Sequence, residues 1–159
     1  MAKKKISVLI LHNIRSAINV GAIFRTADAV GISHIYISGY TPTPIDKFAR
    51  VQKDIAKSAL GAEKSIPWTY SKTPTKIISN LKKEGFQIIG IEQDKRAKDY
   101  RKIKIKDKTA FLLGNEVSGM SESLKNECDT IAEIAMLGEK ESLNVSVAFG
   151  IAVFRILNV

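Results

Sequence analysis

Short apolar runs alternate along the chain with longer segments whose apolar residues recur at helical spacing. The short runs predict buried strands over residues 6–11, 34–38, 87–92, 109–113 and 130–134. The longer segments predict helices over residues 20–30, 73–84, 121–128 and 147–157. Because strands and helices alternate, the pattern predicts an α/β fold in which a parallel sheet is flanked by helices on both faces.

The last predicted helix is apolar on nearly every side, from Val147 to Leu157. A helix without a polar face has to be buried all round. A domain of 159 residues seldom buries a terminal helix so completely by itself, so this helix is predicted to pack against a second subunit. Ser142 and Asn144 lie just before the helix and are therefore expected at a buried junction.

Ligands of parallel α/β sheets bind outside the carboxyl ends of the strands, so the loops after the strands are the candidate sites. In the first such loop, Asn19 is predicted to cap the following helix. Arg25 lies off the apolar stripe of that helix and has small neighbours, which would let a ligand or another backbone approach it. The alternative is an exposed Arg25–Asp28 pair, worth only tenths of a kcal/mol.

The second loop carries Gly114, Glu116 and Gly119 and nearly matches a phosphate-binding P-loop. Met120, however, stands where that motif requires a lysine, so nucleotide hydrolysis is disfavoured. The glycines could still let backbone groups bind an adenine or a ribose. Alternatively, this loop is only a tight turn between a strand and a helix.

The third loop precedes the last helix and contains Ser142, Asn144 and Ser146. Each of them could simply cap that helix, which is the default interpretation for any one alone. Together with Glu116 and Arg25, they would form a polar cluster of hydroxyl, amide, carboxylate and guanidinium groups without a metal.

Composition limits the classes of partner and compartment. The net charge of +9 and the pI of about 9.7 favour a polyanionic partner such as nucleic acid, although an ordinary basic protein is the alternative. One cysteine and two histidines exclude an internal disulfide and a zinc cluster of these residues. No apolar run is long enough for a signal peptide core or a membrane span, so the chain is predicted to be soluble and cytoplasmic.

Much of the positive charge lies between Lys95 and Lys108, where eight basic residues face two acidic ones, a net charge of +6. Tyr100 lies within this basic tract and could stack on a base. A solvated loop is the alternative. Because the tract directly precedes the strand of the glycine loop, it is expected to guide RNA toward the site.

Taken together, the three loops resemble the three signature motifs of the SpoU (TrmH-like) branch of the SPOUT RNA methyltransferases. The matching segments are residues 19–27, 113–119 and 134–148. The stretch 56–64 also resembles small single-domain members, so the likeness spans essentially the whole chain. Three ordered motifs at matching spacing are far more specific than any one of them.

This resemblance implies a SPOUT-type fold with a C-terminal trefoil knot, an exception to the general absence of knots. It implies one methyltransferase domain over residues 1–159, without a separate RNA-binding domain, and a homodimer whose sites draw on both subunits. It also implies S-adenosylmethionine as cofactor, no metal, and methyl transfer to a ribose 2′-hydroxyl of tRNA or rRNA. The alternative is a non-catalytic RNA-binding protein that retains the fold.

The resemblance further assigns site residues by position in the motifs. The catalytic group comprises Arg25, Asn19, Glu116, Ser142 and Asn144. The cofactor-binding group comprises Ile91, Gly114, Ile134, Met136 and Leu143. Ala135 departs from the family pattern, which usually has proline there, so the third loop is expected to be less rigid.

A guanidinium is effectively always protonated, so Arg25 is a poor candidate for a general base. We expect it to clamp the adjacent RNA phosphate and to stabilise the developing alkoxide. The proton of the hydroxyl would leave through a phosphate oxygen, water or Glu116.

Overall fold

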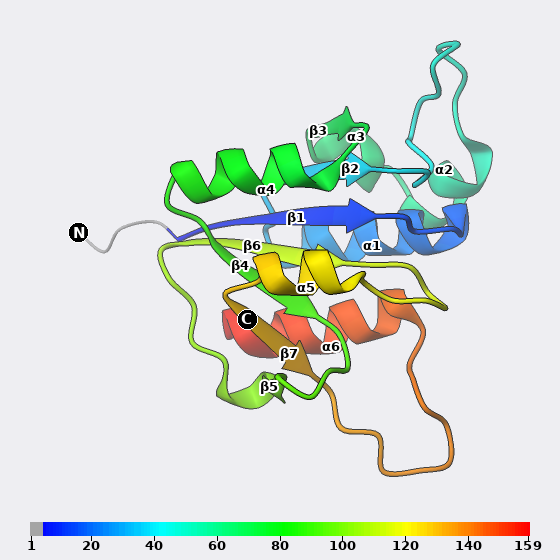
Figure 1. The fold of residues 1–159 in the computed structure, drawn as a ribbon. Helices are drawn as coiled ribbons and strands as arrows, with labels where there is room; N and C mark the ends of the chain where they lie inside the picture. The colour runs from blue at the N-terminus through cyan, green and yellow to red at the C-terminus, as the bar shows by residue number, and fades with distance from the viewer. Residues whose placement is uncertain (1–4) are drawn as a thin grey trace.

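The computed structural model describes residues 5–159, which form a seven-stranded, entirely parallel sheet (Figure 1). The strands are β1 (Ile6–His12), β2 (His34–Ser38), β3 (Trp68–Ser71), β4 (Gln87–Ile91), β5 (Lys98–Asp99), β6 (Lys108–Leu113) and β7 (Thr130–Glu133). Their order in the sheet is β3-β2-β1-β6-β4-β7-β5. The helices are α1 (Ala17–Ala29), α2 (Lys53–Ala59), α3 (Ala62–Ser65), α4 (Pro74–Lys83), α5 (Glu122–Glu127) and α6 (Val145–Leu157), with a 3-10 turn η1 (Tyr100–Lys102).

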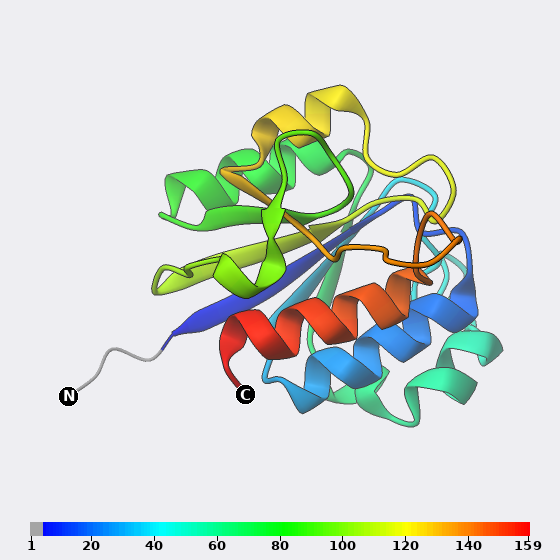
Figure 2. The same ribbon diagram turned by 90° about the horizontal axis from the view of Figure 1, so that it is seen from below.

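The helices form a layer on each face of the sheet, which confirms the predicted fold class. Figure 2 shows α1, α2 and α6 on one face, with α4 and α5 on the other. The central strands serve both layers because successive side chains of a strand point to opposite faces. On β1, Leu9 and Leu11 pack with the α1 and α6 layer, whereas Val8 and Ile10 pack with the α4 and α5 layer. The central strands are therefore buried on both faces of the sheet. The threading of a knot stays a prediction.

Five elements lie outside the sequence-based prediction: α2, α3, β3, β5 and η1. All are short, and none contains an apolar run. In α2, for example, only Ile55 and Ala59 are buried. β3 is the edge strand beyond β2 and alternates little in burial, so its strand conformation depends on pairing with Ile35–Ser38. These elements follow from tertiary contacts rather than from their own periodicity.

The N-cap of the first helix lies three residues before Asn19, and the predicted cap is therefore wrong. Ser16 is the N-cap, with its side-chain oxygen accepting a hydrogen bond from Asn19 N at 3.2 Å. Both residue types are good N-caps, and Ser16 adopts the extended backbone conformation that the position requires. The amide side chain of Asn19 is consequently available for other contacts.

Helix α6 is buried on only one side within the single chain. Its inward residues are Phe149, Ala152, Val153 and Ile156. On the other side, Val147 is 48% exposed, and Ile151 and Phe154 are each 39% exposed. This apolar outer face lacks a cover among the described residues, so the second subunit stays a prediction.

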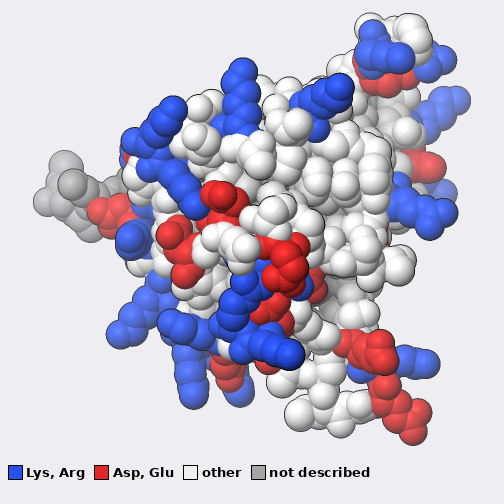
Figure 3. All heavy atoms as spheres, viewed as in Figure 1, with Lys and Arg blue, Asp and Glu red and all other residues white. Residues whose placement is uncertain are grey.

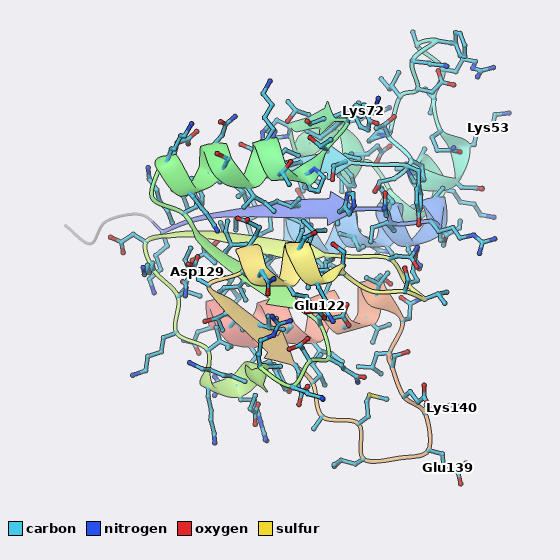
Figure 4. The ribbon with its side chains drawn as sticks, viewed as in Figure 1. Lys53, Lys72, Glu122, Asp129, Glu139 and Lys140 are labelled. Carbon is cyan, nitrogen blue, oxygen red and sulfur yellow. The ribbon has the colours of Figure 1, made fainter. Side chains whose placement is uncertain are left out.

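All strands run in the same direction, so their carboxyl ends meet at one edge of the sheet, on the right in Figure 1. The loops that follow β1, β4, β6 and β7 therefore converge there. The loop over residues 134–144 projects from this edge, and Figure 4 shows Glu139 and Lys140 at its outer turn, pointing away from the fold. Within residues 5–159, no helix is both long enough and apolar enough to cross a lipid bilayer.

Candidate functional site

A chain of hydrogen bonds joins the three loops at the carboxyl edge. Asn19 at the start of α1 donates from Nδ2 to Glu116 Oε1 at 3.1 Å. Its Oδ1 atom accepts from Asn144 Nδ2, also at 3.1 Å. Asn144 is in turn the N-cap of α6, accepting from Ser146 N at 2.9 Å. Three of the predicted catalytic residues, distant in sequence, are thus brought together, and one of the proposed caps of α6 is identified.

The Glu116 carboxylate lies at the N-terminus of α1. Besides Asn19, it accepts from Arg15 N at 2.8 Å and from Ser16 N at 3.0 Å. Desolvation raises the pKa of Glu116, but these backbone and amide donors outweigh it and bring the pKa below its ordinary value. A carboxylate held by three donors is a weak base. We therefore interpret Glu116 as a residue that positions the first and second loops.

This arrangement predicts a pH-dependent contribution to stability. A depressed pKa in the folded state stabilises the fold above the unfolded-state pKa, and the contribution is lost as the pH falls through the folded-state value. Glu116→Gln should lower the free energy of unfolding by about 1 kcal/mol at neutral pH, because the neutral amide accepts the N–H groups more weakly. Urea denaturation at neutral and acidic pH measures the difference. It should shrink in acid, and a difference that stays constant would contradict the interpretation.

The carboxyl edge also contains a pocket between the loops after β4, β6 and β7. Its walls include all five residues that the resemblance assigns to the cofactor, together with Glu116 and Ser142 from the predicted catalytic group. The apolar part of the lining is Ile91, Leu113, Ala132, Ile134, Met136, Leu143, Val145 and Ala148. The polar part is Glu92, Gln93, Asn115, Glu116, Glu133 and Ser142. The sequence thus located the pocket through residues that are close only in the folded chain.

The charge of the lining limits the ligand. Glu92, Glu116 and Glu133 contribute carboxylates, and no lysine or arginine of residues 5–159 belongs to the lining, although the whole chain carries a net charge of +9. Phosphate groups would be repelled, whereas a sulfonium cation with an apolar adenine fits these walls. The residues of the pocket lining therefore suit S-adenosylmethionine. Within the described chain, no group of three or more His, Cys, Asp or Glu side chains could hold a metal ion.

Glu92 was missed by the sequence-based prediction. Its carboxylate follows β4 directly and accepts from Met120 N at 3.0 Å and Gln93 N at 2.9 Å. It thereby joins the β4 loop to the glycine loop and leaves carboxylate surface on the pocket. The sequence did contain a signal for Glu92 as a site residue, namely a carboxylate directly after a predicted buried strand. The contacts of that carboxylate follow only from the fold.

Met120 settles the P-loop comparison. The side chain is 4% exposed and packs in the core beneath α4 and α5. The position that would carry the phosphate-binding lysine therefore points into the protein. Nucleotide hydrolysis by a P-loop is excluded at this site.

Gly114 ends β6 against the turn of the glycine loop. A Cβ atom there would lie 2.7 Å from Met120 Cγ and 2.9 Å from Gly119 C and Met120 N. Two of these atoms belong to the backbone, so Gly114→Ala should displace the loop and weaken S-adenosylmethionine binding about tenfold or more. Isothermal titration calorimetry measures the affinity. Gly138→Ala is the matched control, because nothing lies within 4 Å of its added Cβ atom and the affinity should stay that of the wild type.

Arg25 is not part of this cluster. It lies on α1 six residues beyond Asn19, about 9 Å farther along the helix axis. Its side chain is exposed, and the alternative pair with Asp28 is absent from the ion pairs of residues 5–159. A single chain therefore presents Arg25 on its surface rather than in its own pocket.

The basic tract runs from one edge of the sheet to the other. It begins after the carboxyl end of β4 but ends where β6 begins, at the opposite edge of the sheet. Figure 3 shows basic side chains gathered at lower left, in the region of β5. Two of the cations are also paired, Arg96 with Asp94 at 2.8 Å and Arg101 with Asp99 at 2.6 Å. The position before β6 is therefore no reason to expect RNA guidance, because a segment that precedes a parallel strand enters at the amino edge, and the guidance itself stays a prediction.

Known proteins have sequences similar to that of this chain. Residues 7–154 match the model of the SpoU rRNA Methylase family. A 23S rRNA (guanosine-2′-O-)-methyltransferase, RlmB, of Neisseria meningitidis is 35% identical over 143 residues, which cover 90% of this chain and 54% of that protein. The chain spans between 54% and 58% of the length of the curated relatives compared.

Solved structures agree with the sequence match. An S-adenosylmethionine-bound rRNA methyltransferase from Sinorhizobium meliloti superimposes with a TM-score of 0.87 at 28% identity, covering 99% of this chain and 58% of that one. The TrmH/SpoU tRNA modifying enzyme of A. aeolicus gives a TM-score of 0.83, also at 28% identity, covering 98% and 76%. The likeness in fold therefore extends over nearly the whole chain.

Proposed function

Because this chain belongs to the SpoU rRNA Methylase family, we propose that it transfers a methyl group from S-adenosylmethionine to a ribose 2′-hydroxyl of tRNA or rRNA. The observation that carries this proposal is the carboxylate-lined pocket beside the Glu116–Asn19–Asn144 chain. The names of similar proteins support it, since one acts on a guanosine 2′-oxygen of rRNA and another was solved with S-adenosylmethionine bound.

The residues of the pocket would hold the cofactor through apolar walls and loop backbone. Ile91, Ile134 and Leu143 would enclose the adenine, and Gly114 would allow close approach of the backbone. When bound, S-adenosylmethionine supplies a methyl group activated by its sulfonium. Ser142 lies at the rim, where a hydroxyl can orient the ribose. Much of the rate would come from this positioning of the 2′-oxygen.

Arg25 would reach a pocket from the partner subunit. The outer face of α6, formed by Val147, Ile151 and Phe154, is the proposed dimer contact, and α1 packs beside α6. Arg25 on α1 is therefore close to the proposed interface. Its fixed positive charge would clamp a phosphate and stabilise the 2′-alkoxide, while the proton leaves to water or a phosphate oxygen.

Transfer of labelled methyl groups tests the proposal. The purified protein is incubated with methyl-labelled S-adenosylmethionine and separated tRNA and rRNA, and the modified ribose is mapped. Label at a 2′-oxygen is the expected result. Cofactor binding without transfer to either RNA would contradict the proposed substrates, and failure to bind S-adenosylmethionine in calorimetry would favour a non-catalytic RNA-binding protein.

A further inference from the structure

A projecting segment between β2 and α2 lies at the same edge of the sheet as the pocket. This arm, residues 40–52, extends at upper right in Figure 1. Ile45 and Val51 pair across it as an isolated antiparallel bridge, and Asp46 accepts from Phe48 N at 2.8 Å. The arm is thus an ordered feature, although none of the three signature motifs includes it.

Tyr40, at the base of the arm, is an exposed aromatic residue with fixed hydrogen bonds. Tyr40 is 60% exposed to solvent. The backbone N donates to Asn13 Oδ1 at 3.1 Å, and the phenol oxygen accepts from Asn115 Nδ2 at 2.8 Å. Asn115 directly precedes Glu116 and lines the pocket. The ring is therefore held in place next to the proposed reaction centre.

A groove begins at Tyr40 and runs between the arm and β3. Its walls include Tyr40, Ile45 and Lys47 from the arm and Trp68 and Tyr70 from β3. Tyr70 donates from its hydroxyl to Gly39 O at 2.9 Å, which ties β3 to the end of β2. Aromatic rings with fixed polar ends suit a planar ligand that stacks.

Positive charge accompanies the aromatic groups. Phe48 is 65% exposed, with Lys47 Nζ 5.1 Å and Arg50 Cζ 4.9 Å from its ring centroid. Arg50 is paired with Asp46, but Lys47 forms no ion pair among the described residues. Figure 4 shows Lys53 pointing outward from the start of α2, beside the arm. Aromatic surface with interleaved cations is typical of sites for single-stranded nucleic acid.

We propose that this groove binds an unpaired nucleobase of the substrate RNA, adjacent to the ribose that is methylated. The base stacks on Tyr40, and Lys47 neutralises a neighbouring phosphate. This inference rests on the proposed function, because it places the RNA beside the pocket. It also explains how RNA can be held at the carboxyl edge while the basic tract lies mostly elsewhere.

Two pairs of variants test the groove in the full chain. Tyr40→Leu removes the ring, whereas Tyr40→Phe retains it and loses only the hydroxyl. Lys47→Ala removes a cation at the groove, whereas Lys104→Ala removes one near the start of β4, where Lys104 O accepts from Gln87 Nε2. The probe is a short fluorescein-labelled single-stranded RNA in an anisotropy titration, alongside calorimetry with S-adenosylmethionine.

Tyr40→Leu and Lys47→Ala should each weaken RNA binding about tenfold, with cofactor affinity unchanged. Lys104→Ala should bind RNA like the wild type, and Tyr40→Phe, which keeps the ring but loses its bond to Asn115, should weaken RNA binding much less than Tyr40→Leu. Wild-type RNA affinity in Tyr40→Leu would overturn the inference. So would a lower sedimentation coefficient of Tyr40→Leu than of the wild type, because it would show that the groove contacts another copy of the protein. If RNA binding falls as expected but the wild type transfers no methyl group, the groove is supported and the proposed reaction is wrong.

Discussion

Arg25→Lys should lower the single-turnover rate of methyl transfer about a hundredfold, which is the typical effect of removing one donor to a developing oxyanion. Lysine keeps the positive charge but loses the planar fork that binds phosphate and alkoxide together. Rapid-quench measurement with saturating S-adenosylmethionine and RNA isolates this step from cofactor binding.

The structure provides a clear control for that variant. Arg25 is exposed and lies outside the pocket lining, so its replacement should leave folding and cofactor affinity unchanged. Arg101→Lys makes the same substitution on η1, where Asp99 is the one ion-pair partner of Arg101 within the described part of the chain. It should retain the wild-type rate. A near wild-type rate in Arg25→Lys would show that charge alone suffices and that the bidentate clamp is wrong.

The centre of the fold was predictable from the sequence because its strands are buried on both faces. β1 and β6 are almost continuously apolar, and such runs predict strands without knowledge of their neighbours. The edge strand β3 and the helix α2 could not be found in this way. β3 is only four residues long and α2 buries only two residues, and their conformations are stabilised by pairing with β2 and packing against α1.

In the candidate site, too, some features were predictable from the sequence and others depend on long-range contacts. Gly114, Ile134 and Leu143 were assigned by motif and do line one pocket. The hydrogen-bond chain could not be predicted, because Asn19 and Ser16 are both suitable caps. Ser16 is the cap in the structure. Its backbone N and that of Arg15 donate to Glu116, which lies about a hundred residues away in sequence. Tyr40 likewise acquires its place beside the site through a long-range contact, with Asn115.

Phe154→Asp should convert a dimer into monomers and abolish methyl transfer. The substitution would place a carboxylate in the apolar outer face of α6, where its desolvation costs several kcal/mol in a closed interface. Sedimentation velocity measures the change in mass. Leu60→Asp is the matched control, because Leu60 is an exposed apolar residue at the end of α2. A monomeric wild type, or a Phe154→Asp variant that remains dimeric, would contradict the proposed interface.

Mixing two impaired variants, at an S-adenosylmethionine concentration too low to occupy the Gly114→Ala pocket, then tests whether Arg25 acts across that interface. Arg25→Ala retains the pocket, and Gly114→Ala retains Arg25 while its own pocket binds cofactor weakly. If the subunits exchange randomly, half of the dimers are mixed, and each contains one complete site. Activity should therefore recover to about a quarter of the wild-type value. If Arg25 instead served the pocket of its own chain, no mixed dimer would contain a complete site and the mixture would remain inactive.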